Sequence, residues 1–346
     1  MMTVYNKQGN SLDITIRFAY PDEALLLIAL MKKQHGDYYQ NPQFYDENYV
    51  REGLETERFR FAVAELADGT LVGMVGASTD TLFRGSLIII LLTVNPPQRG
   101  FNIGKRLCRF ILDSVPSDTV TCVYAHCVTL DTVSQKIHQE FGYQMTGLLF
   151  NRCIYDTDAE NFAGLALPFK HNHIVACLPQ AKRDAGMLYP LPSYSAFIKD
   201  VYEPLGVHYT LNMEKNTKSE APQTKYAFHQ YEKFQYGELF VWEAGPDFTD
   251  ILEKTLTQYG ALQQQSFNVF VNLNDPLCPT VCRLLEVHGF FFTGVQPLSG
   301  QYEYMILHYS PSIPVPFEQI AVIPEFTRQF ADIQDRYRHR RRNLVS

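Results

Sequence analysis

The amino-acid sequence predicts an α/β fold, with a mixed sheet flanked by helices in each of two domains. The chain has 346 residues, and at roughly 100–200 residues per domain this length favours two domains. Hydrophobic residues make up 46% of the sequence and charged residues 19%, which is enough apolar material for two cores. Short apolar segments alternate with helical segments along the whole chain, as in sheets whose strands are connected by helices.

The first half begins with an alternating strand at Ile14–Phe18 and a helix from Tyr20 to Lys33, which has proline and acids at its start and lysines at its end. Ser86–Val94 is long, apolar and rich in β-branched residues, as a central strand is. A hairpin turn at 67–70 joins two further strands. The remaining strands of this half are predicted at Arg60–Glu65, Leu71–Ser78, Val120–Val128 and Tyr143–Leu149, and the remaining helices at Glu47–Leu54, from about Gly104 to Ser114, and at Thr132–Phe141.

The second half repeats this order of elements after a predicted linker at residues 158–172. Glu140-Phe141-Gly142-Tyr143 is echoed by Val287-His288-Gly289-Phe290, and a Thr-Gly pair follows each segment. We favour divergent duplication over chance similarity, and predict domains at 1–157 and 173–312 with a C-terminal helix and tail at 313–346. The helices are predicted at Ser193–Leu205, Asp247–Tyr259 and Pro279–Val287, and the strands at Tyr226–Gln235, Glu238–Glu243, Phe267–Leu273, Gly289–Val295 and Tyr302–Tyr309.

Charge and cysteine content narrow the class of protein. The net charge of −7 argues against a generally basic nucleic-acid-binding protein. The seven cysteines are scattered without a CxxC pair, so we expect a reducing compartment and neither a disulfide framework nor a zinc site. No apolar stretch follows basic residues near the N-terminus, and the longest apolar run, Leu87–Leu92, is too short to cross a bilayer. A cytoplasmic protein is therefore expected.

The most informative segment is the loop that follows the central strand. It contains Arg99, Gly100, Asn102, Gly104 and Lys105 before the next helix. Glycine and asparagine tolerate positive φ, so successive N–H groups can converge there, and the positive end of the helix dipole adds to them. The pattern predicts a pyrophosphate-binding loop, with an ordinary glycine-rich turn as the alternative. The glycine spacing fits neither a Walker A loop nor a Rossmann fingerprint.

At these residues the sequence resembles the GNAT superfamily, the Gcn5-related N-acyltransferases. The family pattern is V-x-P, then Q/R-x-x-G-x-G/A, then an apolar residue three positions after the last glycine. Val94-Asn95-Pro96 supplies the first part, Arg99 to Gly104 the second, and Leu107 the third. Asn102 stands where the family usually has glycine, and asparagine is the next best residue for left-handed geometry.

A second family pattern, N-x-x-A-x-x-x-Y-x-x-x-G-F, is similar to the segment from Asp131 to Tyr143. Asp131, Ser134 and His138 replace its asparagine, alanine and tyrosine. The resemblance covers about residues 11–157 and implies a sheet that splays between two strands to hold acetyl-CoA. It further implies these cofactor-binding residues: Leu92, Thr93 and Val94 for pantetheine, Arg99, Gly100, Phe101, Asn102, Ile103, Gly104 and Lys105 for pyrophosphate, and Ser134 in the second pattern.

The candidate acid and base come from the second pattern and the strand before it. His138 occupies the family's tyrosine position, where a hydroxyl protonates the leaving thiolate, and imidazole can donate a proton at neutral pH. An exposed helix position without a catalytic role is the alternative. Ser86–Val94 contains no acid, so the base candidates are His126 and Tyr124 on one strand face, with a core histidine as the alternative for His126. An acceptor amine that arrives neutral needs no base.

The second half lacks the phosphate loop, because Gly245, Pro246, Asp247 and Asp250 stand where Arg and glycines are needed. It is predicted to be a degenerate GNAT-like domain, which makes the chain a tandem GNAT-like fold, with homodimerisation as one possible role. His171-Asn172-His173 is too sparse to predict a metal. Five arginines within Arg336–Arg342 are typical of a helix that meets RNA, an acidic partner or an anionic membrane surface, or of a solvated terminal helix.

Together these features predict an acetyl-CoA-dependent N-acyltransferase that acetylates an amine by direct attack on the thioester. A CoA-binding regulatory or adaptor protein that has lost catalysis is the competing class, and a pure interaction module the third. The segment Gln34–Tyr49 is rich in Tyr and Asn, which suits a polar acceptor or simple aromatic packing.

Overall fold

The computed structural model describes residues 1–79, 83, 85–116, 118–154, 170–180, 183–213, 221–260 and 266–345. The chain divides into two compact units. The first unit holds the described residues of Met1–Ala125 and Ile154–Pro168, and the second holds those of His126–Cys153 and Phe169–Ser346. The predicted linker at 158–172 lies mainly outside the described residues, and its last two residues begin strand β8, His171–Pro179.

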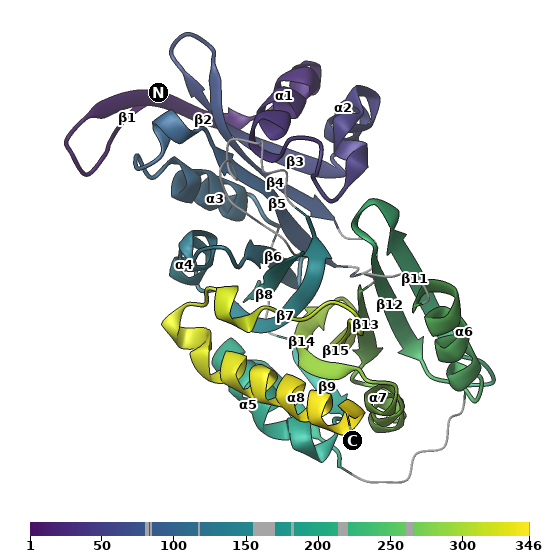
Figure 1. Ribbon diagram of the computed structural model, residues 1–346. Helices are drawn as coiled ribbons and strands as arrows, with labels where there is room; N and C mark the ends of the chain where they lie inside the picture. Colours follow the sequence, from purple (N-terminus) through teal and green to yellow (C-terminus); the bar gives the residue numbers. More distant parts are fainter. Residues whose placement is uncertain are drawn as a thin grey trace. The chain divides into compact units, whose positions relative to one another are not determined.

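The first unit is built on a mixed sheet (Figure 1). Its strands lie in chain order and are antiparallel from β1 to β5, whereas β5 and β6 are parallel. This arrangement confirms the predicted α/β class, and Ser86–Val94 is the strand that the sequence predicted. The strands are β1 Met2–Tyr5, β2 Ser11–Phe18, β3 Phe59–Leu66, β4 Leu71–Thr79, β5 Ser86–Val94 and β6 Cys122–Val128, whose residues from His126 onward belong to the second unit; the helices are α1 Ala24–His35, α2 Glu47–Glu55 and α3 Ile103–Asp113.

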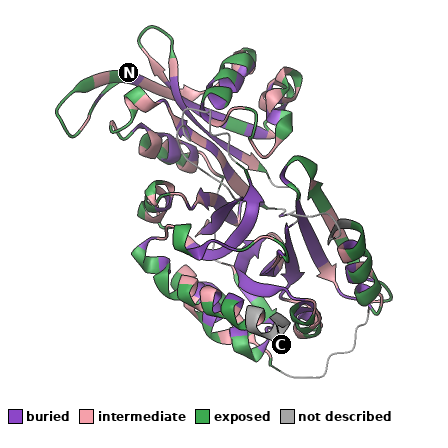
Figure 2. Ribbon diagram, in the orientation of Figure 1, coloured by how far each residue is buried: buried purple, intermediate pink, exposed green. Residues whose placement is uncertain are grey.

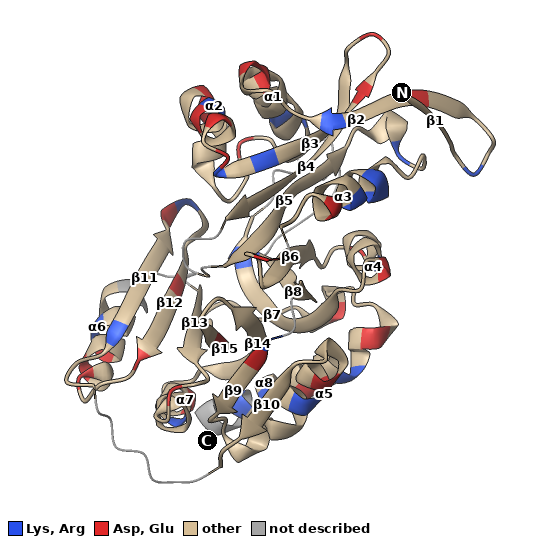
Figure 3. Ribbon diagram, turned by 180° about the vertical axis from the view of Figure 1, so that it is seen from behind, with Lys and Arg blue, Asp and Glu red and all other residues tan. Residues whose placement is uncertain are grey.

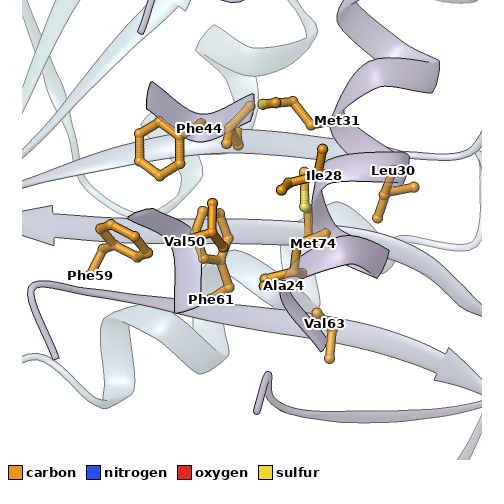
Figure 4. Close-up of a cluster of buried hydrophobic side chains, with 12 residues drawn as sticks. Ala24, Ile28, Leu30, Met31, Phe44, Val50, Phe59, Phe61, Val63 and Met74 are labelled. Atoms are coloured by element: carbon orange, nitrogen blue, oxygen red, sulfur yellow. The ribbon is translucent and has the colours of Figure 1, made fainter. Parts of the chain in front are cut away.

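Helices cover both faces of this sheet. Helices α1 and α2 bury apolar side chains against β3, β4 and β5 on one face (Figure 4). Helix α3 packs on the other face, where Phe110 lies 4.8 Å from Phe18 between ring centroids. Phe44 joins the first core through edge-to-face contact with Phe61, so the tyrosine-rich segment after α1 is at least partly a packing element. Members of the buried cluster include Leu27, Met31, Val50, Phe59, Val63, Met74 and Leu91.

In the second unit, seven strands lie side by side in the order β8, β7, β14, β15, β13, β12 and β11. Strands β9 and β10 form a separate two-stranded sheet. Strands β7, β8, β12, β13, β14 and β15 are almost entirely buried, whereas β11 at the edge and the strands of the two-stranded sheet are largely exposed or half-buried (Figure 2). Tyr194, just before α5, stacks on Phe292 at 4.3 Å, and Tyr337 of α8 packs on Phe291. The further bounds are β7 Gln144–Cys153, β9 Asp184–Leu188, β10 His208–Leu211, β11 Lys225–Tyr231, β12 Tyr236–Glu243, β13 Ser266–Asn272, β14 Phe291–Ser299, β15 Tyr302–Tyr309, α4 Val133–Glu140, α5 Ser195–Leu205, α6 Phe248–Gly260, α7 Cys278–Val287 and α8 Thr327–Val345.

The two segments that echo each other in sequence have the same local geometry. Gly142 ends α4 with φ +88°, and Gly289 ends α7 with φ +86°. The strands that follow, β7 and β14, pair with each other at Gly147 and Gly294. A Cβ on Gly294 would lie 2.3 Å from the Cα of Gly147, so the glycine of each Thr-Gly pair lets the two backbones approach. Duplication itself stays a prediction.

The arginines near the C-terminus have partners within the second unit. Arg336 donates to Asp332 and to the carbonyl of Ser193, and its guanidinium lies over the ring of Tyr194. Arg338 pairs with Asp335 at 3.1 Å. These contacts fix part of the predicted basic segment against the protein. In the part of the chain that the structure describes, none of the helices has the length and apolar character needed to span a membrane.

Candidate active site

Strand β5 separates from one of its two neighbours before it ends. Its pairing with β4 continues to Val94 opposite Gly73, whereas the described pairs with β6 end at Ile89 opposite Ala125. Leu91 has a φ of +52°, and the register with β4 shifts at the same place. A bulge of this kind bends a strand away from its partner. The backbone of Leu92, Thr93 and Val94 therefore has an edge outside the β6 ladder.

The loop after β5 holds its backbone in the conformation that the sequence predicted. Gly100 has φ +87°, and a Cβ there would meet nothing within 4 Å. Asn102 adopts the left-handed conformation at φ 58° and ψ 22° and forms the N-cap of α3 without a side-chain cap. The first helical hydrogen bond runs from the N–H of Arg106 to the carbonyl of Asn102. The N–H groups of the first turn precede it and point along the helix axis, beyond the N-terminus.

Arg99 braces this loop from within the first unit. Its Nε donates to the carbonyl of Val94 at 3.1 Å, and its second guanidinium nitrogen donates to Oε1 of Gln34 at 3.2 Å. Gln34 is fully buried and donates in turn to the side chain of Asn95. Sequence reasoning missed Gln34 as part of this site. The available signal was a glutamine on the otherwise apolar buried face of α1.

Positive charge gathers at the loop and along α3 (Figure 3). Lys105 is partly buried in the first helical turn, whereas Arg106 and Arg109 are exposed further along. A helix N-terminus with backbone N–H groups and nearby cations is a general anion-binding arrangement. The loop therefore suits an anion, and the edge of β5 outside the β6 ladder offers backbone hydrogen-bonding groups.

His138 is buried on α4 in the second unit. Its Nδ1 lies 2.8 Å from the carbonyl of Ser134 and 3.6 Å from Sγ of Cys127. Its ring meets Tyr143 edge to face at 4.9 Å, and among the described residues Nε2 has no hydrogen-bond partner. Burial lowers the pKa of His138, so the neutral ring dominates at pH 7, with Nδ1–H donating to Ser134.

His126 and Tyr124 lie on β6, and Tyr124 is buried 6.1 Å from the ring of Phe83. Nδ1 of His126 is 2.6 Å from a guanidinium nitrogen of Arg152, within the second unit. Burial and the charge of Arg152 hold the pKa of His126 well below its usual value. The guanidinium has only donors, so Nδ1 accepts and the neutral ring carries its proton on Nε2. His126 is thus arranged as a hydrogen-bond donor at neutral pH rather than as a base.

The two candidate histidines lie on opposite sides of β6. Adjacent side chains of a strand point to opposite faces, and the one that contacts His138 belongs to Cys127, the neighbour of His126. His126 instead contacts Arg152. This arrangement does not bring His138 and His126 together as one acid–base pair.

In the second unit, the loop after β12 is already filled by the chain itself. Thr224 donates to Asp247 through both its N–H and its hydroxyl and accepts from the N–H of Gly245. The hydrogen bonds from Thr224 hold the pKa of Asp247 below its usual value. A Cβ on Gly245 would lie 2.5 Å from the backbone of Gln223. Strands β12 and β13 pair continuously from Tyr236 to Val241. Among the described strands of this unit, the strand before the loop therefore does not separate from its parallel neighbour as β5 separates from β6.

Residues 27–143 match the family described as Acetyltransferase (GNAT) family. This span includes both sequence patterns, and the resemblance predicted from them is confirmed. Residues 27–143 are a GNAT acetyltransferase domain. This segment is therefore an N-acetyltransferase domain, and the cofactor of its family is acetyl-CoA.

Several solved structures are similar to about half of the chain. An acetyltransferase of the GNAT family from Streptococcus pneumoniae is 13% identical, covering 48% of this chain and 99% of its own, with a TM-score of 0.39. An N-acetyltransferase from Staphylococcus aureus is 15% identical, with coverages of 49% and 99% and a TM-score of 0.39. Spermidine N-acetyltransferase from Vibrio cholerae, in complex with CoA and spermine, is 16% identical, with coverages of 48% and 95% and a TM-score of 0.38. No curated protein matches the sequence.

Proposed function

We propose that the chain transfers an acetyl group from acetyl-CoA to an amine by direct attack on the thioester, and that the loop from Arg99 to Lys105 holds the cofactor. The observation that carries the proposal is the conformation of this loop: Asn102 is left-handed at the start of α3, directly after a strand that has left its parallel neighbour. Acetyl-CoA supplies an activated acetyl group, and the protein's task is to hold it and to manage protons.

The binding residues divide between two kinds of backbone surface. The open edge of Leu92, Thr93 and Val94 offers N–H and carbonyl groups that suit the amides of pantetheine. The first turn of α3 offers converging N–H groups for the pyrophosphate, and Lys105 adds charge close to them. Arg99 acts mainly by bracing the loop through Gln34 and Val94. Phe101 and Ile103 take part through their backbone, and Ser134 is assigned to the cofactor from the second family pattern.

His138 remains our candidate for the group that protonates the leaving thiolate. Its Nδ1 is committed to the carbonyl of Ser134, so a proton can be donated only from Nε2 of the imidazolium form. Because burial lowers the pKa of His138, the donating form becomes more populated as pH falls. Tyr124 stays the second candidate, and His126 fits better as a neutral donor than as the base.

We expect the purified chain to release CoA from acetyl-CoA when a suitable amine is present, and a His138→Phe variant to turn over about 10-fold more slowly near pH 6. General acid catalysis typically contributes 10²–10⁴-fold, and only the protonated fraction of His138 contributes here. The parent-to-variant ratio of kcat should approach one as pH rises to 9. CoA affinity should hardly change, because the interaction is made mainly in the transition state.

His288 offers a matched control for this experiment. It lies at the end of α7, and its Nδ1 is also 2.8 Å from the carbonyl four residues earlier, that of Leu284. His288→Phe should therefore leave kcat at the parent value at every pH. Equal kcat values for His138→Phe and the parent chain would remove His138 from the catalytic machinery.

The competing proposal is a CoA-binding regulatory protein without catalysis, which the acid-free strand β5 favours. It predicts CoA binding without turnover on any amine. We place either activity in the cytoplasm, because all seven cysteines are unbridged and buried. An acidic partner or RNA at Arg336–Arg342, and a homodimer, stay predictions.

A further inference from the structure

A group of buried polar side chains in the second unit lies outside the cofactor loop. We call it the Arg152 cluster and define it as His126, Arg152, Lys170, His173 and Glu238. Arg152, Lys170 and Glu238 are each at most 8% exposed. The five residues of the cluster lie on β6, β7, β8 and β12, with Lys170 directly before β8. Buried groups of this kind are costly unless their hydrogen-bonding and charge requirements are met.

Arg152 is the centre of the cluster. One terminal nitrogen lies 2.6 Å from Nδ1 of His126, and the other lies 3.3 Å from Oε1 of Glu238. Among the described residues, its Nε has no hydrogen-bond partner, although the atom is buried. A guanidinium Nε–H is always a donor. Within the described part of the chain, one strong buried donor is therefore left over.

His126 supplies a second donor next to Arg152. Its Nδ1 accepts from the guanidinium, so the neutral ring places its proton on Nε2. In the described part of the chain, this buried Nε2 also has no partner. Burial and the charge of Arg152 keep the pKa of His126 well below its usual value, which keeps the ring in this neutral form. Both left-over groups donate; because Nδ1 of His126 faces Arg152, its Nε2–H points away from the guanidinium, and each donor lacks an acceptor of its own among the described residues.

The backbone that carries Arg152 is held in an unusual conformation. Asn151, the preceding residue, has φ +50° within an irregular stretch of β7. Its N–H donates to Asn172, its carbonyl accepts from Ser266, and its side chain donates to Ser310. Strained positions persist where the surroundings fix them, and bulges redirect the neighbouring side chain. The fold thus sets the direction of Arg152 from several sides.

The charges of the cluster leave it positive. Glu238 balances Arg152 and also accepts from the hydroxyls of Tyr236 and Tyr231. Lys170 is the second cation; burial lowers its pKa to about 8, so it is mostly protonated at pH 7. Its Nζ donates to the carbonyl of Gln235 and to Ser266, whose hydroxyl contacts Asn151 next to Arg152. Burial also holds the pKa of His173 well below its usual value. The net charge is about one positive unit.

We propose that the Arg152 cluster binds the carboxylate of a small ligand, with Arg152 Nε–H as its donor. A carboxylate supplies acceptor oxygens and a single negative charge, which matches the single excess positive charge of the cluster. A phosphate would bring more negative charge than the cluster balances. This inference goes beyond acetyl transfer and does not depend on it, since Arg152, Lys170 and Glu238 have no part in the proposed reaction and the carboxylate is bound without turnover.

The test compares acetate with acetamide, two molecules of nearly equal shape that differ in the carboxylate. The full-length chain is melted at constant ionic strength, set with sodium chloride, in the presence of acetate, glycine, L-alanine, L-glutamate or acetamide. Unfolding is followed by the fluorescence of Trp242, the single tryptophan, which lies on β12. We expect a saturable rise in melting temperature with one or more of the carboxylates and none with acetamide.

Variants decide whether Arg152 is responsible. Arg152→Gln should weaken carboxylate binding at least 10-fold, whereas Arg338→Gln, at an exposed arginine paired with Asp335, should bind like the parent. If Arg152→Gln fails to fold because Glu238 is left unpaired, the double variant Arg152→Gln, Glu238→Gln removes both charges and should also lose binding. An equal response of the parent chain to acetate and acetamide, no saturable response to any carboxylate of the set, or unchanged binding in either Arg152 variant would overturn the proposal.

Discussion

A Gly294→Ala variant is expected to be about 3–5 kcal/mol less stable than the parent chain. The added Cβ would lie 2.3 Å from the Cα of Gly147 and 2.6 Å from the carbonyl oxygen of Thr146, both backbone atoms that cannot rotate away. Gly294 also has φ +139°, a region that residues with a Cβ rarely adopt. Overpacking typically costs about 1–3 kcal/mol and backbone strain about 1–3 kcal/mol. Urea unfolding followed by Trp242 fluorescence measures the change.

Gly142→Ala is the matched control for this variant. Gly142 also has a positive φ, +88°, but the nearest atom to its added Cβ is a side-chain carbon of Leu178 at 3.6 Å. The control carries backbone strain alone and should lose only about 1 kcal/mol. Similar urea midpoints for the two variants would show that β7 and β14 do not approach each other closely at Gly147 and Gly294.

A Gly104→Val variant is expected to bind CoA at least about 100-fold more weakly while keeping its fold. Gly104 lies in the first turn of α3, where the missing Cβ allows a phosphate to approach the backbone. Each hydrogen bond to a charged group contributes about 1.5–3 kcal/mol, so losing two weakens binding by two or more orders of magnitude. Valine is a better helix former than glycine, and the helix itself is not weakened. Titration calorimetry with CoA measures the change.

Gly104→Ala provides the graded control, because its single methyl group obstructs the same N–H groups less. Its affinity should fall between those of the parent and the valine variant, with all three chains melting at similar temperatures. An unchanged CoA affinity for Gly104→Val would move the pyrophosphate away from this loop.

Local sequence signals were sufficient for much of the first unit. Ser86–Val94 was predicted residue for residue because a run of β-branched apolar residues has few other stable conformations. The helix predicted at Thr132–Phe141 is observed at Val133–Glu140, since frayed helix ends shift assignments by a residue or two. Asn102 was singled out as tolerating left-handed geometry, and its φ of 58° agrees with that prediction.

Features set by distant contacts were not predictable in this way. The burial of Gln34 and its bond to Arg99 join residues 65 positions apart, and no local pattern encodes that pair. Strand β8 was not predicted, and its first two residues, His171 and Asn172, were placed at the end of the linker; both are polar, yet both lie buried in the second unit. The contact of His126 with Arg152 depends on an irregularity in β7, and a bulge leaves no reliable signal in one sequence.

Native mass spectrometry of the full-length chain at saturating CoA can show whether the chain holds one acetyl-CoA site, on the loop after β5. We expect one CoA per chain, because the corresponding loop after β12 is filled by Thr224 and carries the ionised Asp247. Pro246 in that loop has no N–H to offer, and a carboxylate near a phosphate is repulsive. Two CoA molecules per chain would mean that the second unit also binds the cofactor, and none would mean that the loop after β5 does not.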